Sequence, residues 1–326
     1  MKITIIGAGA MGGTIGGYFS LGGADVRFVD PYREHIDKIN ADGLEMTVNG
    51  ESKIIRAKGY YSASEIGETM DFVVIVTKGH YIESAIQGAL CLFDEHTACM
   101  AIQNGMGNVD ILSKYVDKSR IYASIVQLGA SMPGPGKVEV LKRDGAMLSC
   151  GPVVQEEPTD GIRAVTELLT RGGLDAFAMT RAEINQKIWY KMTANCTGNP
   201  CCAVTRLPLG RFTNCPEGIE IKSALLEEIL AVAECEGVTG LREITTATKY
   251  WPEDNPMYHH VPSTAQDVRN KRKTEIDFLN GAIVRLGKKH GIPTPYNSMI
   301  TNLVHIIENN YYYSFTILIY YSPFIC

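Results

Sequence analysis

Lys191, Asn195 and Asn199 recur at four-residue intervals in a segment that we expect to be helical. This spacing places the three side chains near one face of a helix, on successive turns. Bulky residues flank the lysine, and partial desolvation lowers the pKa of an amine toward the range that is useful for proton transfer. The pattern alone nevertheless favours the plainer interpretation of a surface lysine with two structural asparagines.

A second group of reactive side chains lies between residues 263 and 277. Ser263 and Gln266 have the spacing of a capping box, which predicts Ser263 as a helix N-cap. A serine at the start of a helix also suits a bound carboxylate. Asp267, Glu275 and Asp277 follow in a charged segment, and their pattern does not single out Glu275.

The third group follows the short apolar run from Lys2 to Ile6, which is typical of a buried parallel strand. Three glycines follow this run: Gly7 permits a tight turn, Gly9 lets a pyrophosphate approach the backbone, and Gly12 lets a helix pack closely on the strand. The N–H groups and the positive dipole end of that helix would hold phosphates. We therefore predict a dinucleotide site made of Gly7, Gly9, Ala10, Met11 and Gly12.

Asp30 ends the next strand-like run, eighteen residues after Gly12, where a carboxylate can hydrogen-bond a ribose hydroxyl. A carboxylate there favours NAD and repels the 2′-phosphate of NADP. Arg33, three residues on, leaves a phosphate contact open. The alternative to a dinucleotide site is a glycine turn in an α/β domain that binds no ligand.

Strand and helix patterns alternate around these groups up to about residue 181. Further buried strands are expected at 71–77, 98–102 and 121–126, with antiparallel strands at 138–141 and 146–150 closing that half of the sheet. Alternation of this kind predicts an α/β Rossmann-type doubly wound sheet domain over residues 1–181.

The remaining chain has a helical pattern. Helices are expected at 184–197, 217–236, 265–287 and 296–309, so that residues 182–310 form an all-helical C-terminal domain. Residues 311–326 are an uncharged, β-prone hydrophobic tail that resembles an aggregation segment and is short for a membrane span.

Composition excludes several classes of protein. The chain has 326 residues, a net charge of −5 and a pI near 5.9, which gives no basic footprint for nucleic acid. The N-terminus has no signal or transit pattern, so we expect a cytoplasmic protein without a membrane partner.

Nine cysteines without a C-x-x-C pair argue against a disulfide framework or a metal site. His259 and His260 are expected in a surface loop.

Five motifs in this order resemble the ketopantoate reductase (2-dehydropantoate 2-reductase) family up to about residue 300. They are Gly7 to Gly12, Val76-Thr77-Lys78, Gln103-Asn104-Gly105-Met106-Gly107, Lys191 with Asn195 and Asn199-Pro200, and Ser263 to Gly281. The resemblance implies an oxidoreductase of pantothenate biosynthesis that acts on a CH–OH group with NADP or NAD, its substrate held between a Rossmann domain and a helical domain.

The same resemblance implies a role for individual residues. Lys191 and Glu275 would be the catalytic pair, while Asn195, Asn199 and Ser263 would bind a small 2-oxo acid. Lys78 and Asn104 would contact the cofactor.

Three questions stay open at this stage. Asp30 favours an NAD-dependent D-2-hydroxy-acid dehydrogenase of the same family as one alternative. A dinucleotide-binding sensor without turnover is an alternative of another class, although it would not need Lys191 and Glu275. The sequence also leaves open whether the chain forms a homodimer.

Overall fold

The computed structural model describes residues 1–141, 147–245 and 250–311, so the predicted tail lies outside the described residues except for Tyr311. The chain divides into two compact units, Met1–Ile188 and Trp189–Cys326. The boundary falls inside one helix, α6 (Arg181–Thr205), which contributes its first two turns to the first unit. Each unit is described below by itself.

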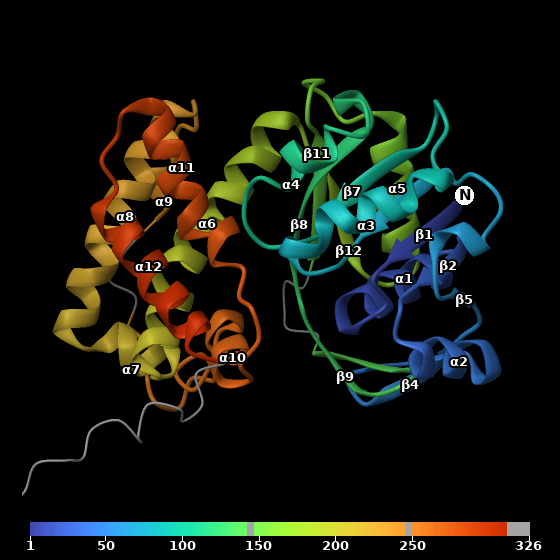
Figure 1. Ribbon diagram of the computed structural model, residues 1–326, viewed down its shortest axis with the longest axis horizontal. Coiled ribbons are helices and arrows are strands. Elements are labelled where there is room, and N and C mark those ends of the chain that lie inside the picture. Colours follow the sequence, from blue (N-terminus) through green and yellow to red (C-terminus); the bar gives the residue numbers. More distant parts are fainter. Residues whose placement is uncertain (142–146, 246–249, 312–326) are drawn as a thin grey trace, which may run out of the picture. The chain divides into compact units, whose positions relative to one another are not determined.

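The main sheet of the first unit has the strand order β12-β11-β8-β7-β6-β1-β2-β5 in the described residues (Figure 1). Neighbouring strands are parallel except for β8 and β11, which are antiparallel as predicted for residues 146–150. The strands are β1 (Lys2–Ile6), β2 (Asp25–Val29), β5 (Lys58–Tyr60), β6 (Phe72–Ile75), β7 (Ala98–Ala101), β8 (Ile121–Gln127), β11 (Met147–Pro152) and β12 (Asp175–Ala178).

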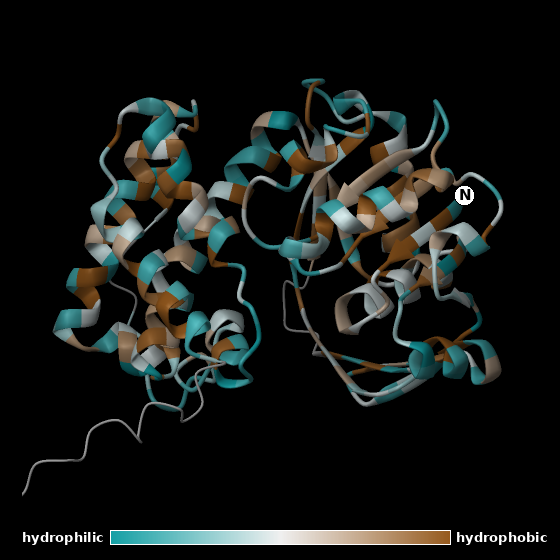
Figure 2. Cartoon of the chain, in the orientation of Figure 1, coloured by the Kyte–Doolittle hydropathy of each residue, from teal (hydrophilic) through white to brown (hydrophobic). Residues whose placement is uncertain are grey.

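Helices pack on this sheet and bury its apolar strands. Strand β6 is buried along its whole length and β1 along all but its first residue, and the central strands are largely brown in Figure 2. Two-sided burial explains why these strands are continuous apolar runs. The helices of this unit before α6 are α1 (Ala10–Leu21), α2 (Arg33–Asp42), α3 (Ile82–Ala89), α4 (Asn108–Leu112) and α5 (Asp160–Arg171).

A second sheet, of order β4-β3-β10-β9, corrects the expectation that residues 138–141 close the main sheet. Its strands are β3 (Leu44–Val48), β4 (Glu51–Ile55), β9 (Gly129–Gly134) and β10 (Lys137–Leu141). Strand β10 pairs with β3 instead, because it packs against the glycine face of α1: a Cβ added to Gly13 would lie 2.7 Å from Val138. Helix α1 therefore lies against both sheets.

The second unit contains helices and no strand among its described residues. They are the rest of α6, then α7 (Leu209–Asn214), α8 (Pro216–Cys235), α9 (Leu241–Ile244), α10 (Ser263–Arg269), α11 (Asn280–His290) and α12 (Pro295–Asn309). An α/β doubly wound domain followed by a helical domain is the fold class that the sequence predicts.

The single helix predicted over residues 265–287 is wrong. Helix α10 ends at Arg269, and Lys271 adopts a left-handed backbone with φ of 51°. A short 3₁₀ turn (Ile276–Phe278) precedes α11. The break is made by a lysine rather than by glycine or proline, so neither of the usual breaker residues marked it in the sequence.

Within the described ranges, no helix is both long and apolar enough to cross a membrane. No group of three histidine, cysteine, aspartate or glutamate side chains gathers there in a metal-binding arrangement, and the eight cysteines described are free thiols.

Candidate active site

The turn between β1 and α1 has the backbone geometry that suits a pyrophosphate. Gly7 has a φ of 97°, a conformation that glycine adopts without strain. A Cβ on Gly12 would lie 1.8 Å from the Gly7 carbonyl oxygen, so the helix packs directly on the turn. Apart from Gly9 and its two chain neighbours, no described atom lies within 4 Å of the position of a Cβ on Gly9, which leaves open space where a phosphate group would approach.

Ala10 and Met11 form the start of α1. In the described chain this helix end carries neither an acidic residue in its first turn nor a side-chain cap. Its N–H groups and dipole therefore favour an anion. The residues of the turn fit the pyrophosphate of a dinucleotide.

Asp30 follows β2 and lies beside the same turn. Its two carboxylate oxygens accept hydrogen bonds from the Ala8 N–H at 2.8 Å and the Tyr32 N–H at 2.9 Å. Each oxygen keeps a further lone pair that can accept from a ribose hydroxyl. The exposed Arg33 stacks on Tyr61, with its guanidinium 4.4 Å from the ring centre.

Lys78 and Asn104 follow β6 and β7, the first and second neighbours of β1 on one side. These strands are parallel, so their carboxyl ends share one edge of the sheet with the glycine turn. The chain passes from β1 to β2 on one side and continues to β6 on the other, which makes this edge a switch point where α/β sheets bind ligands.

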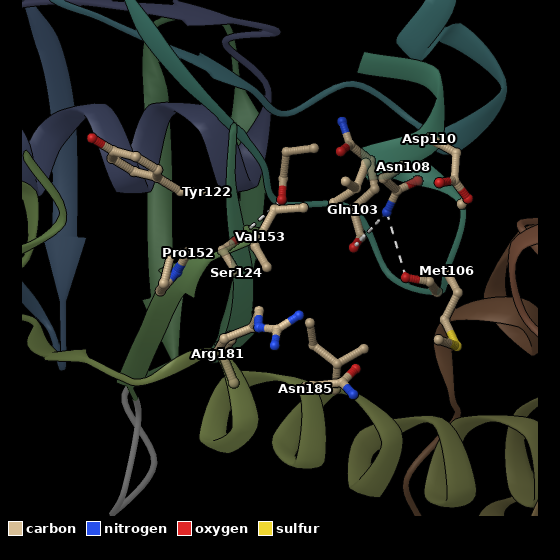
Figure 3. Close-up of a pocket in the computed structure, with 17 residues that line it drawn as sticks. Gln103, Met106, Asn108, Asp110, Tyr122, Ser124, Pro152, Val153, Arg181 and Asn185 are labelled. Atoms are coloured by element: carbon tan, nitrogen blue, oxygen red, sulfur yellow. Dashed lines mark hydrogen bonds between the residues drawn. The ribbon is translucent and has the colours of Figure 1, made fainter. Parts of the chain in front are cut away.

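A pocket of about 320 Å³ opens beside the end of β7, wholly within the first unit. Gln103 lines it from the loop that follows the strand, Asn108 from the start of α4, and Arg181 and Asn185 from α6 (Figure 3). Arg181 forms an ion pair with Glu156. The pocket thus has polar residues in its wall. It lies at the carboxyl-terminal edge of the main sheet, where the glycine turn also lies.

Lys191, Asn195 and Asn199 lie on successive turns of α6 and are half-buried. Trp189 and Met192, beside the lysine, are 1% and 2% exposed. The row therefore borders a packed core, as desolvation of the lysine requires.

Pro200 continues α6 although proline has no N–H to donate to the Cys196 carbonyl one turn earlier. The Asn280 side chain supplies the missing donor, with its Nδ2 3.0 Å from that carbonyl oxygen. Asn280 is fully buried and also donates to Asn297 at 2.9 Å. Helix α11 thereby supports the helix that carries the lysine row.

The structure brings Lys191 and Glu275 together. Burial lowers the pKa of Lys191 from 10.5 to about 8, and the nearby negative charge of Glu275 opposes part of that shift. Glu275 is itself 8% exposed. A lysine with this pKa is mostly protonated at neutral pH and can still release its proton, which suits a general acid.

The other two carboxylates of this segment are engaged elsewhere. Asp267 pairs with Arg272 at 3.1 Å, and Asp277 accepts from His305 Nε2 at 3.1 Å. The sequence pattern could not separate them from Glu275, whereas tertiary packing does.

The predicted capping role of Ser263 is wrong. Pro262 is the N-cap of α10, Ser263 is its first residue, and no side chain of the described chain caps this helix. The Gln266 amide instead donates to the Val261 carbonyl. Ser263 is half-buried on the second unit, together with Lys191 and Glu275.

Sequence reasoning missed His35, which supports the glycine turn from α2. Its Nε2 lies 2.9 Å from the Ala8 carbonyl, and its Nδ1 accepts from the Gly136 N–H at 2.9 Å. His35 is 1% exposed, and nothing local in the sequence distinguishes it from a surface histidine. The role of Asn280 was also missed, because Pro200 lies beyond the helix predicted over residues 184–197, whereas α6 continues through it to Thr205.

Two family profiles match nearly the whole chain. The profile described as "Ketopantoate reductase PanE/ApbA" matches residues 3–151, and "Ketopantoate reductase PanE/ApbA C terminal" matches residues 183–308. The chain belongs to the ketopantoate reductase family. The predicted family, its fold class and its oxidoreductase class are confirmed.

Curated relatives of this family are similar over almost their full length. The 2-dehydropantoate 2-reductase of Lactococcus lactis subsp. lactis is 32% identical over 312 residues, covering 94% of this chain and 98% of that protein. The 2-dehydropantoate 2-reductase of Aquifex aeolicus is 28% identical over 314 residues, covering 94% and 97%.

Solved structures of the family share the fold. D-mandelate dehydrogenase, solved with NADH and anilino(oxo)acetate, has a TM-score of 0.82 at 29% identity, covering 95% of this chain and 99% of that one. A putative 2-dehydropantoate 2-reductase from Enterococcus faecalis has a TM-score of 0.75 at 30% identity, with coverage of 95% and 99%. The family uses NAD(P)H and small keto acids.

Proposed function

We propose that this protein reduces 2-dehydropantoate to D-pantoate with NAD(P)H. The observation that carries the proposal is the lowered pKa of Lys191, about 8, next to Glu275 and on the helix face that also bears Asn195 and Asn199. The names of the curated relatives favour this substrate. The open, anion-compatible turn at Gly9 supports the cofactor assignment.

In this mechanism Lys191 and Glu275 of the second unit have different roles. Bound NAD(P)H supplies the hydride for the ketone carbon. Lys191 donates a hydrogen bond to the carbonyl oxygen and then the proton that the developing alkoxide needs. Glu275 keeps a negative charge beside Lys191 and so helps to hold that proton on its Nζ.

The remaining polar residues bind and orient the substrate. The Asn195 and Asn199 amides offer both donors and acceptors to the oxo and hydroxyl groups. The Ser263 hydroxyl would donate to the carboxylate. Alignment by such groups supplies a large share of the rate in reactions of this kind.

On the first unit, Gly7, Gly9, Ala10, Met11 and Gly12 would hold the pyrophosphate, while Lys78 and Asn104 would contact the rest of the cofactor. Asp30 favours NADH, because a 2′-phosphate would lie next to its carboxylate. Arg33 is the nearest candidate to offset that charge, but it stacks on Tyr61.

A second candidate function is an NAD-dependent D-2-hydroxy-acid dehydrogenase. Asp30 favours it, and so does the similarity to a D-mandelate dehydrogenase solved with NADH. The two candidates share the site and differ in the side chain of the substrate.

One assay tests both. Oxidation of NADH and NADPH is followed with a panel of 2-oxo acids that includes 2-dehydropantoate and phenylglyoxylate. We expect the highest kcat/KM with 2-dehydropantoate and NADH. A clear preference for phenylglyoxylate would favour the second candidate, and dinucleotide binding without turnover of any 2-oxo acid would favour a sensor.

A further inference from the structure

His35 is a buried imidazole that bridges two backbone groups from distant parts of the first unit. Its Nδ1 lies 2.9 Å from the Gly136 nitrogen, and its Nε2 lies 2.9 Å from the Ala8 carbonyl oxygen. A backbone N–H only donates and a carbonyl oxygen only accepts, so the ring is held as the neutral tautomer with its proton on Nε2. Both ring nitrogens are thus engaged, and the side chain is 1% exposed. His35 can therefore act on the site only through the groups that it holds.

The Ala8 carbonyl belongs to the same peptide group as the Gly9 N–H. A trans peptide is planar, so this N–H points away from the carbonyl and from the imidazole that donates to it. The hydrogen bond from His35 thus fixes the direction of the Gly9 N–H, a donor that the glycine turn offers to a pyrophosphate. The same bond polarises the peptide and strengthens its N–H as a donor.

The two backbone groups that hold the Asp30 carboxylate belong to residues in contact with His35. The Ala8 N–H donates to one carboxylate oxygen at 2.8 Å, and the Tyr32 N–H donates to the other at 2.9 Å. The Tyr32 ring stacks on the imidazole, with ring centres 6.1 Å apart and an angle of 10° between the planes. One buried side chain therefore supports both donors of the carboxylate that is expected to meet the adenosine ribose.

The other side of the imidazole is held by the turn between β9 and β10. Gly136 has a φ of 71°, a conformation that favours glycine, and a Cβ there would lie 2.6 Å from Lys38. Its carbonyl accepts from the Glu45 N–H at 2.8 Å, which ties the turn to β3. The second sheet thus presents a fixed donor to Nδ1, and this donor keeps the His35 ring in one orientation.

We propose that His35 is a positioning residue of the dinucleotide site. Its bond to the Ala8 carbonyl holds the Gly9 N–H in place for the pyrophosphate and the Asp30 carboxylate in place for the adenosine ribose. This inference rests on the proposed function. It gives the glycine turn and the ribose carboxylate, which are separate motifs in the sequence, a common support on α2.

Two substitutions separate the two hydrogen bonds of His35. The glutamine amide nitrogen reaches the position of Nε2, so His35→Gln keeps the donor to Ala8. Asparagine is one carbon shorter and its oxygen takes the position of Nδ1, so His35→Asn keeps only the acceptor for Gly136. Asn40→Leu is the matched control, because Asn40 lies on the same helix and its amide forms two hydrogen bonds with the Gly59 backbone of β5, at 2.8 and 3.0 Å.

Affinities for ADP-ribose and for its 2′-phosphate are measured by calorimetry, which needs no turnover, and thermal melting checks that each variant folds. We expect His35→Asn to weaken ADP-ribose binding about tenfold, because one hydrogen bond and the ordering of the carboxylate are lost. Its preference for ADP-ribose over the 2′-phosphate should fall toward one. His35→Gln should stay within about threefold of the wild type, and Asn40→Leu should equal it.

Steady-state kinetics give a second measurement. In His35→Asn the KM for NADH should rise, while kcat and the KM for the 2-oxo acid stay unchanged, since His35 is proposed to act on the cofactor alone. If this variant does not fold, ¹⁵N NMR of the wild type decides. The His35 imidazole signals should report a proton on Nε2 and should shift when ADP-ribose binds, and unchanged signals would overturn the inference.

Other results would also overturn it. Equal losses in His35→Gln and His35→Asn would mean that packing alone explains them. A folded His35→Asn protein with the ADP-ribose affinity of the wild type would remove the role of the Ala8 bond, and a loss of the same size in Asn40→Leu would assign the effect to α2 as a whole. In each of these cases the wild type still binds ADP-ribose. A wild type that binds neither ADP-ribose nor NADH would remove the proposed function itself.

Discussion

Replacing Asn280 by leucine should destabilise the second unit, because it removes the donor that serves the Cys196 carbonyl. That carbonyl lacks its intrahelical partner, since residue 200 is proline. Leaving one buried acceptor unpaired costs about 1–3 kcal/mol, and the Asn297 oxygen loses the same donor group. We therefore expect Asn280→Leu to lower the free energy of unfolding by about 3 kcal/mol.

The matched perturbation is Pro200→Ala, which returns an N–H to the helix opposite the Cys196 carbonyl. In that background the loss caused by Asn280→Leu should shrink by about 1–2 kcal/mol, the coupling expected when two groups serve one acceptor. Asn270→Leu is the control, since Asn270 is exposed and donates to a helix carbonyl at 2.8 Å; its cost should stay below about 0.5 kcal/mol.

The assay is urea unfolding followed by tryptophan fluorescence. The two tryptophans of the chain, Trp189 and Trp251, both belong to the second unit, so the signal reports that unit. A cost of Asn280→Leu that is the same with proline and with alanine at position 200 would refute the reasoning.

Three further predictions concern the site. The kcat/KM for reduction should fall about tenfold per pH unit above pH 8, because Lys191 loses the required proton as pH rises through its pKa of about 8; kcat/KM for oxidation of the hydroxy acid should instead rise about tenfold per pH unit below pH 8 and level off above it, and Lys191→Arg should abolish the fall up to pH 10. Gly9→Ala should leave the melting temperature unchanged, because no described protein atom beyond this residue and its two chain neighbours lies within 4 Å of the new methyl group, yet weaken dinucleotide binding by tenfold or more in a calorimetric titration; equal affinity would mean that the pyrophosphate does not approach Gly9. Wild type should favour NADH over NADPH by about tenfold in kcat/KM, because a like-charge pair at about 5 Å costs roughly 3 kcal/mol before screening; Asp30→Asn should shrink this preference, and a wild type that prefers NADPH would contradict the role given to Asp30.

The glycine turn could be predicted from sequence because its geometry is local. Gly7 needs its positive φ and Gly12 its close contact within a few residues of chain. The residue pattern could not single out Glu275 among three carboxylates, and only the family resemblance named it, because its place beside Lys191 follows a helix break at Lys271. The helical pattern continues through the segment, and neither glycine nor proline marks the break.

Pairings between distant segments were equally hard to predict. Strand β10 has the alternating pattern expected of any strand, and only the missing side chain of Gly13 makes room for Val138 on α1. His35 and Asn280 owe their roles to carbonyls 27 and 84 residues away in the sequence. Hydrophobic periodicity predicts the type of a single helix or strand, and it does not predict which distant residues that element will contact.

Helix α6 has a consequence for how this protein can change in evolution. The Lys191 row lies on successive turns of this helix, so helical geometry alone sets the angle of its side chains about the helix axis. Inserting one residue between positions 188 and 191 would rotate the row by about 100° and shift it by about 1.5 Å. Surface loops tolerate insertions and deletions. We expect an insertion in this stretch of α6 to disrupt the site instead.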